Sequence, residues 1–210
     1  MRNASRINDQ VSDYYSKKIT LHGATPHGVD WNSLESQKMR FEQLIKLFKE
    51  DSEILDFGCG YGGLFDFLME GGFEKIHYTG YDISREMIAQ ALKRHANEAN
   101  ANWILDMPSD AKFDYVVASG VFNVRLDIDT ENWESYIFST LKELDDLSVS
   151  GFAFNLLTTY SDKHLMQDHL YYASPERIFK YCKENFSKSI TILHDYPLYE
   201  FTTIVRKNIL

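Results

Sequence analysis

The stretch Glu53-Ile-Leu-Asp-Phe-Gly-Cys-Gly-Tyr-Gly-Gly63 decides the fold of this chain. An apolar run reaches an acid, Asp56, and two residues later breaks into closely spaced glycines. The next segment, Leu64-Phe-Asp-Phe-Leu-Met69, has apolar residues at helical spacing. This pattern predicts a buried strand, a tight turn and the start of a helix. Because glycine has no Cβ, such a turn allows a ligand to approach the backbone.

The glycine spacing fits two classes of nucleotide-binding turn. Gly58-x-Gly60-x-x-Gly63 matches the dinucleotide fingerprint, whereas Gly58-x-Gly60-x-Gly62 matches a different one. Asp56 distinguishes them, because a dinucleotide places its pyrophosphate at the helix N-terminus, where a nearby carboxylate would repel it. A cofactor with a cationic amino-acid tail and no phosphate would be stabilised there. An NAD-dependent oxidoreductase is retained as the alternative.

S-adenosylmethionine (SAM) has these properties, and Asp56-x-Gly58-x-Gly60-x-Gly62 resembles the first motif of the class I SAM-dependent methyltransferases. A second acid, Asp82, ends the next predicted strand about 20 residues after the turn, where it can accept hydrogen bonds from both ribose hydroxyls. Both nucleotide classes use such an acid, so Asp82 indicates an adenosine-type ligand only. The resemblance implies SAM as cofactor and S-adenosylhomocysteine (SAH) as product.

The order of elements predicts a Rossmann-like α/β fold. Residues 8–18 are expected to form a short helix or an ordered arm, and residues 33–49 an amphipathic helix capped by Asn32. After the first two strands, we expect strands at 103–105, 113–118 and 151–157, helices after Ser84, at 131–147 and from Pro175 to about Phe186, and a closing hairpin. The resemblance implies a mostly parallel seven-stranded sheet with an antiparallel last strand, helices on both faces and an N-terminal helical lid.

The totals favour one domain. The chain has 210 residues, 44% of them hydrophobic, so we expect a single domain over 1–210, with a lid at 1–50 and a SAM-binding core at 51–210. A net charge of −9 argues against a nucleic-acid partner. We expect no metal, because the sequence shows no metal-ligand spacing. We expect no membrane association and a cytoplasmic location, because there are only two cysteines, no signal peptide and no apolar run of membrane-spanning length. The oligomeric state is left open.

The resemblance also assigns roles in cofactor binding. Gly58, Gly60 and Gly62 would meet the methionine moiety, Asp56 its ammonium group, and Asp82 the ribose. The remaining expected cofactor contacts are Ile83, Asp106 and Met107 at the adenine, Ser119 after the fourth strand, and Arg40 at the cofactor carboxylate. Two of these assignments have plain alternatives: Asp106 as a solvated strand-end acid, and Arg40 as a surface residue of the lid helix.

Methyl transfer mainly requires alignment of the acceptor, and a hydroxyl acceptor also benefits from a general base. The candidate bases are His22 and His27 in the lid and His164, with His169, after the fifth strand. The aromatic residues expected to line an acceptor pocket are Tyr15, Trp31, Tyr160 and Tyr172, with Tyr171. Each of these side chains could instead be an ordinary surface or packing residue.

After the fourth strand the chain reads Ser119-Gly-Val-Phe122, without the Asn/Asp-Pro-Pro-Tyr signature of enzymes that methylate exocyclic or amide nitrogens. Together with the acidic charge, this favours a small-molecule acceptor methylated at oxygen or nitrogen, of a natural-product or sugar type. The alternatives besides the oxidoreductase are a non-catalytic SAM-binding subunit and a protein or RNA methyltransferase.

Overall fold

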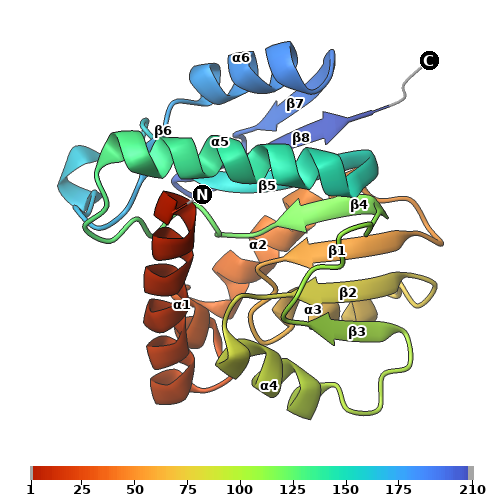
Figure 1. The fold of residues 1–210 in the computed structure, drawn as a ribbon. Helices are drawn as coiled ribbons and strands as arrows, with labels where there is room; N and C mark the ends of the chain where they lie inside the picture. Colours follow the sequence, from red (N-terminus) through yellow and green to blue (C-terminus); the bar gives the residue numbers. More distant parts are fainter. Residues whose placement is uncertain (1, 208–210) are drawn as a thin grey trace.

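The computed structural model describes residues 2–207, so the two ends of the expected 1–210 domain lie outside the described residues. The chain forms one mixed sheet in the order β3-β2-β1-β4-β5-β8-β7, with the short β6 paired to β5 (Figure 1). The strands are β1 (Glu53–Phe57), β2 (His77–Tyr81), β3 (Ala101–Ile104), β4 (Phe113–Ala118), β5 (Ser148–Thr158), β6 (Tyr172–Ala173), β7 (Ser189–Leu193) and β8 (Glu200–Arg206).

Among the described strands, β8 runs against the others, pairing antiparallel with both β5 and β7. The remaining ladders are parallel, as expected when helices connect successive strands. This confirms the Rossmann-like sheet with an antiparallel last strand. The sheet differs from the expectation in containing the extra two-residue β6.

Helices cover both faces of the sheet (Figure 1). The first face carries α2 (Leu34–Leu44), α3 (Gly63–Glu70) and α4 (Arg85–Arg94), which enclose a core around Ile54, Tyr78 and Val117. The other face carries α5 (Thr130–Leu147) and α6 (Pro175–Asn185) over Leu55, Phe152 and other buried side chains. Residues 105–112, between β3 and β4, contain no helix, and α5 packs on β4 and β5.

The N-terminal segment differs most from the expectation. In place of a short helix or arm, α1 spans Arg2–His22 and stands at the carboxyl edge of the sheet (Figure 1). Ile7, Val11 and Ile19 are buried at four-residue multiples, which gives the helix one apolar face. The described residues also include the short 3₁₀ helices η1 (Pro26–Val29), η2 (Ile45–Leu47) and η3 (Lys163–Leu165).

The lid helix is shorter than expected. It ends at Leu44 and tightens into η2, because Phe48 has extended backbone and stops the helix. Its N-cap is Ser33 and not Asn32: the Ser33 hydroxyl accepts a hydrogen bond from the Ser36 N–H at 3.1 Å. Within residues 2–207, none of the helices has the length and apolarity needed to cross a membrane.

Candidate functional site

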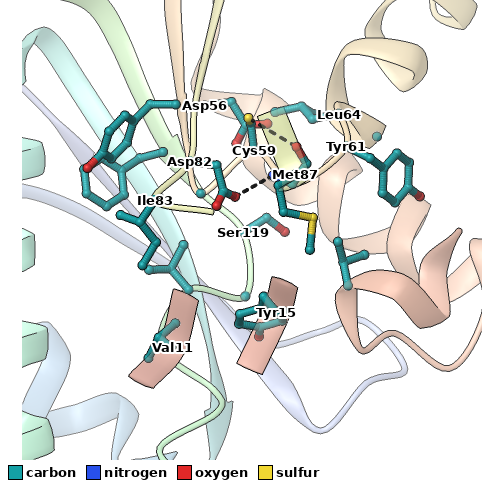
Figure 2. Close-up of a pocket in the computed structure, with 18 of the residues that line it drawn as sticks. Val11, Tyr15, Asp56, Cys59, Tyr61, Leu64, Asp82, Ile83, Met87 and Ser119 are labelled. Atoms are coloured by element: carbon teal, nitrogen blue, oxygen red, sulfur yellow. Dashed lines mark hydrogen bonds between the residues drawn. The ribbon is translucent and has the colours of Figure 1, made fainter. Parts of the chain in front are cut away.

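A cavity of about 190 Å³ lies at the carboxyl edge of the parallel strands, where ligands of open α/β sheets bind. Its floor comes from the loops after β1, β2 and β4, and its roof from α1, the lid loop and α2. Figure 2 shows Val11 and Tyr15 of α1 on one side of this space, with Asp82 and Ser119 opposite. The cavity thus lies between the sheet edge and the first 50 residues.

Asp82 is held rigidly at the end of β2. Its two carboxylate oxygens accept hydrogen bonds from the Gly60 N–H at 2.9 Å and the Ser84 N–H at 2.8 Å. Each oxygen retains a lone pair for a further donor. Burial raises the pKa of Asp82 to about 6, against the lowering effect of these two backbone donors. Asp82 therefore links the glycine turn to the loop after β2 and faces the cavity.

Asp56 is the second buried carboxylate of the cavity wall, with only 2% of its surface exposed. The Tyr78 hydroxyl donates to it at 2.6 Å. Burial raises the pKa of Asp56 to about 7, the Tyr78 hydrogen bond opposes this rise, and the charge of Asp82 adds to it. Because burial disfavours the negative charges of both acids, the cavity wall creates a site that a cation would stabilise.

The turn after β1 needs glycine at position 60, because the backbone there has a positive φ. Gly60 has φ +56, and a Cβ added there would lie 2.9 Å from Cγ1 of Val29 in the lid. The turn is fixed to β2 because the N–H groups of Gly58 and Cys59 both donate to the Tyr81 carbonyl. Backbone can therefore approach a ligand closely at this place.

The cavity wall carries a distinctive set of charges. Asp56, Asp82 and Glu143 line it, and none of the described lining residues is Lys, Arg or His. The Ser119 hydroxyl oxygen is buried there without a hydrogen-bond partner among the described residues. The N-terminus of α3 at Gly63 borders the cavity, but no basic side chain of the described wall is there to pair with a phosphate group. The three acids suit a ligand with positive charge and polar hydroxyl or amino groups.

The structure brings together most of the side chains expected at the cofactor. The expected residues that line the cavity are Asp56, Gly58, Gly60, Asp82, Ile83, Ser119, Tyr15 and Trp31. Gly62 instead caps the N-terminus of α3, with φ 90. Asp106 is exposed, and neither Asp106 nor Met107 is part of the described cavity wall.

Arg40 contacts Trp31 of the cavity wall but is not itself part of the described wall. Its guanidinium binds the Glu200 carboxylate, with Nε 2.9 Å from both oxygens and a terminal nitrogen 2.6 Å from Oε1. Both side chains are buried, so this is an internal ion pair and not a surface arginine. The structure provides Arg40 with a protein carboxylate in the place where we expected the carboxylate of a cofactor.

The expected bases lie outside the cavity. His22, His27 and His164 are exposed, at the end of α1, in η1 and in η3 respectively. Sequence reasoning placed these residues near the site because their segments follow β5 or belong to the lid.

Two of the expected aromatic residues also lie away from the cavity. Tyr160 is 65% exposed, and its hydroxyl donates to the Glu176 carboxylate. The Tyr172 hydroxyl accepts a hydrogen bond from the Gln167 N–H at 3.0 Å, and Tyr172 is not part of the described cavity wall. Of the aromatic side chains expected at an acceptor pocket, Tyr15 and Trp31 are the ones that line the cavity.

Other residues of the wall were not expected. The α5 side chains Tyr136, Ser139, Thr140 and Glu143 line the cavity with the i, i+3, i+4, i+7 spacing of one helical face. From α2, Gln37 is buried and accepts a hydrogen bond from the Tyr61 hydroxyl at 3.1 Å. The helical spacing is visible in the sequence, but the face of α5 that meets the cavity depends on how this helix packs on β4 and β5.

The fold and the acidic, glycine-floored cavity define a class I methyltransferase architecture, and comparisons with known proteins identify the family. A family model described as a methyltransferase domain matches residues 55–144. A protein of Mycobacterium tuberculosis strain H37Rv named as a methyltransferase, Rv1506c, is 52% identical over 155 residues, which cover 73% of this chain and 92% of that protein. The chain therefore belongs to the methyltransferase-domain family and is a SAM-dependent enzyme.

Solved structures share the fold at low sequence identity. The N-methyltransferase NodS from Bradyrhizobium japonicum WM9, in complex with SAH, is 15% identical with a TM-score of 0.62, over 97% of this chain and 100% of that one. A complex of DhpI with SAM and HEP is also 15% identical with a TM-score of 0.62, over 95% and 97% of the two chains. At this level of identity, the two structures show that the fold is shared.

Proposed function

We propose that this enzyme transfers the methyl group of SAM to a nitrogen or oxygen atom of a small molecule that binds beneath the N-terminal lid. The observation that carries the proposal is the cavity itself, which is roofed by α1 and α2 and lined by acids without a basic residue among its described members. Such a wall disfavours phosphate groups, and hence nucleic acid, as the acceptor. Residues 1–50 would act as the lid and residues 51–210 as the core.

In this proposal the cofactor is held by the residues that already face the cavity. Asp82 accepts from the ribose hydroxyls, Asp56 stabilises the ammonium group, Ile83 packs on the adenine, and the hydroxyl of Ser119 gains the partner it lacks among the described residues. Gly58 and Gly60 provide the close backbone approach. The fixed position of Asp82, between two backbone N–H groups, supports its role because it requires no rearrangement on binding.

Nitrogen is the favoured acceptor atom. The sulfonium group of SAM supplies an activated methyl group, so an uncharged amine can attack it without a base, whereas a hydroxyl benefits from one. The expected histidines lie outside the cavity, and burial raises the pKa of Tyr15 well above its usual value, which keeps that hydroxyl protonated. Asp56 and Asp82 are assigned to the cofactor, so Glu143 is the carboxylate of the described wall that is left to assist a hydroxyl acceptor. A natural-product or sugar-type molecule carrying an amino group is the acceptor class that fits best.

The test combines binding and turnover. Calorimetry with SAM, SAH and NAD should show binding of the first two and none of NAD. SAH release should then be measured with matched amino and hydroxyl forms of the same sugars and aromatic compounds, and with transfer RNA. We expect faster turnover with the amino forms than with the matched hydroxyl forms, and none with transfer RNA. Turnover of RNA, or of hydroxyl forms in preference to amino forms, would contradict the acceptor class, and NAD binding would contradict the proposal as a whole.

A further inference from the structure

One aromatic side chain of the cavity wall, Trp31, is fixed in place by a closed circuit of buried contacts. The Arg40 guanidinium lies 3.9 Å from the centre of the Trp31 ring. Arg40 pairs with Glu200, and Glu200 accepts from the Asn155 side chain at 2.5 Å. Asn155 in turn accepts from the Gly120 N–H at 2.8 Å. The circuit closes where the Trp31 ring lies against Gly120.

The contact between Trp31 and Gly120 leaves no space for a side chain. A Cβ added at Gly120 would lie 2.3 Å from Cζ2 of Trp31, and the backbone there has φ +73, which favours glycine. The indole is thus held between a guanidinium and the loop after β4. Trp31 is half-buried and lines the cavity, whereas Arg40, Asn155 and Glu200 are buried behind it.

The position of Trp31 along the sheet edge relates it to the acceptor. Asp82 follows β2, the glycine turn follows β1, and Gly120 follows β4, in the spatial order β2-β1-β4. Neighbouring strands lie about 4.8 Å apart, so Gly120 is about 10 Å from the ribose-binding end. In the proposed function the ribose lies at Asp82 and the amino-acid part at the glycine turn, which leaves the space on the β4 side, beside Trp31, for the acceptor.

We propose that Trp31 is the wall of the acceptor site, contacting a flat or apolar part of the acceptor, and that Arg40, Glu200 and Asn155 are positioning residues that hold its ring. This inference rests on the proposed function. An ion pair buried this deeply carries a desolvation cost, and a well-packed apolar pair would serve stability equally well. The circuit therefore fits a requirement for a fixed indole better than a requirement for stability alone.

The test uses two SAM analogues in which a tertiary nitrogen replaces the sulfur and carries either a methyl or a benzyl group. The benzyl group extends from the nitrogen into the space where the acceptor would bind. Stacking on Trp31 should therefore make the benzyl analogue bind about 3- to 10-fold more tightly than the methyl analogue. We expect Trp31→Leu to remove this preference while the affinity for the methyl analogue changes by less than about twofold. Tyr160→Leu, an exposed aromatic outside the cavity, is the matched control and should leave both affinities unchanged.

The positioning residues are tested by the ratio of the affinities for the benzyl and methyl analogues. Arg40→Met should reduce the benzyl preference as Trp31→Leu does, and Arg40→Met combined with Glu200→Gln removes the charge pair without leaving a buried carboxylate alone. A merely structural circuit would lower the melting temperature of these variants and leave the ratio unchanged.

Two results would overturn the inference: a ratio unaffected by Trp31→Leu, or tighter binding of the benzyl analogue to that variant, which would show that Trp31 blocks the space. Failure of both analogues to bind the wild-type enzyme would instead refute the proposed function.

Discussion

Replacing Asp56 by asparagine should stabilise the ligand-free protein and weaken cofactor binding at the same time. The Asp56 carboxyl group is buried, and its pKa in the folded state is about 7, against about 4 in an unfolded chain. The folded state therefore holds this proton more tightly than the unfolded state. As the pH rises from about 4 to about 7, the unfolded state ionises first, and the free energy of unfolding falls.

The magnitude follows from the difference in pKa. A difference of about three units at about 1.4 kcal/mol each gives an upper limit of about 4 kcal/mol above pH 7. Relaxation around the charge reduces this value, so we expect about 1–3 kcal/mol, or about 3–10 °C in melting temperature for a chain of this size. The amide oxygen of the substituted side chain can still accept the hydrogen bond that the Tyr78 hydroxyl donates at 2.6 Å, so shape and packing are conserved.

Thermal and urea unfolding of the wild type and the Asp56→Asn variant should be compared from about pH 4.5 to about pH 8.5, which spans the two pKa values. The stability difference should be small at the acidic end and should grow in favour of the variant as the pH rises. Calorimetry near neutral pH should show SAM bound about 10-fold more weakly by the variant, because a neutral amide replaces a charged partner. A variant that is less stable than the wild type at alkaline pH, or a difference independent of pH, would refute the reasoning.

Three further expectations follow from the site. Asp82→Asn should raise the dissociation constant for SAM about 10-fold or more, because the substitution weakens the ribose hydrogen bonds. For the wild type, the dissociation constant for SAM should fall from about pH 5 to about pH 8 as the carboxylates ionise, and a flat pH profile in calorimetry would contradict this. Gly60→Val should abolish SAM binding and also lower the melting temperature by several degrees, since φ is +56 and the lid approaches closely; normal binding would show that the turn is structural only. His27→Ala and His164→Ala should retain turnover within about twofold, and a loss of about 100-fold in either would restore that histidine as a base.

The sequence predicted the sheet, and it predicted that Asp56, the glycine turn and Asp82 lie together at one edge of it, because those signals are local. A strand, a glycine turn and a following acid lie close together in the chain between Glu53 and Asp82, and parallel strands bring their carboxyl ends together. The sequence also contains a signal for the length of α1. Ile7, Val11, Tyr15 and Ile19 repeat every four residues, as on one face of a helix, but the polar residues between them make this pattern weak.

The rest depended on contacts that no local pattern encodes. The partner of Arg40 is 160 residues away, so the sequence alone could not distinguish a cofactor ligand from an internal ion pair. The histidines were expected at the site from loop membership, yet a loop that starts at the carboxyl edge can direct its side chains into solvent. Glu143 was not predicted because its place in the cavity wall depends on how α5 packs on β4 and β5.

The pairing of α2 with β8 has a consequence for biosynthesis. Glu200 lies in β8, so a growing polypeptide cannot form the ion pair between Arg40 of α2 and Glu200 until β8 has left the ribosome. A nascent chain that ends before β8 contains Asp56, Asp82 and the glycine turn but not the counter-ion of Arg40. The ion pair that holds Arg40 beside Trp31 can therefore form only after all the described residues of the cavity wall have been synthesised.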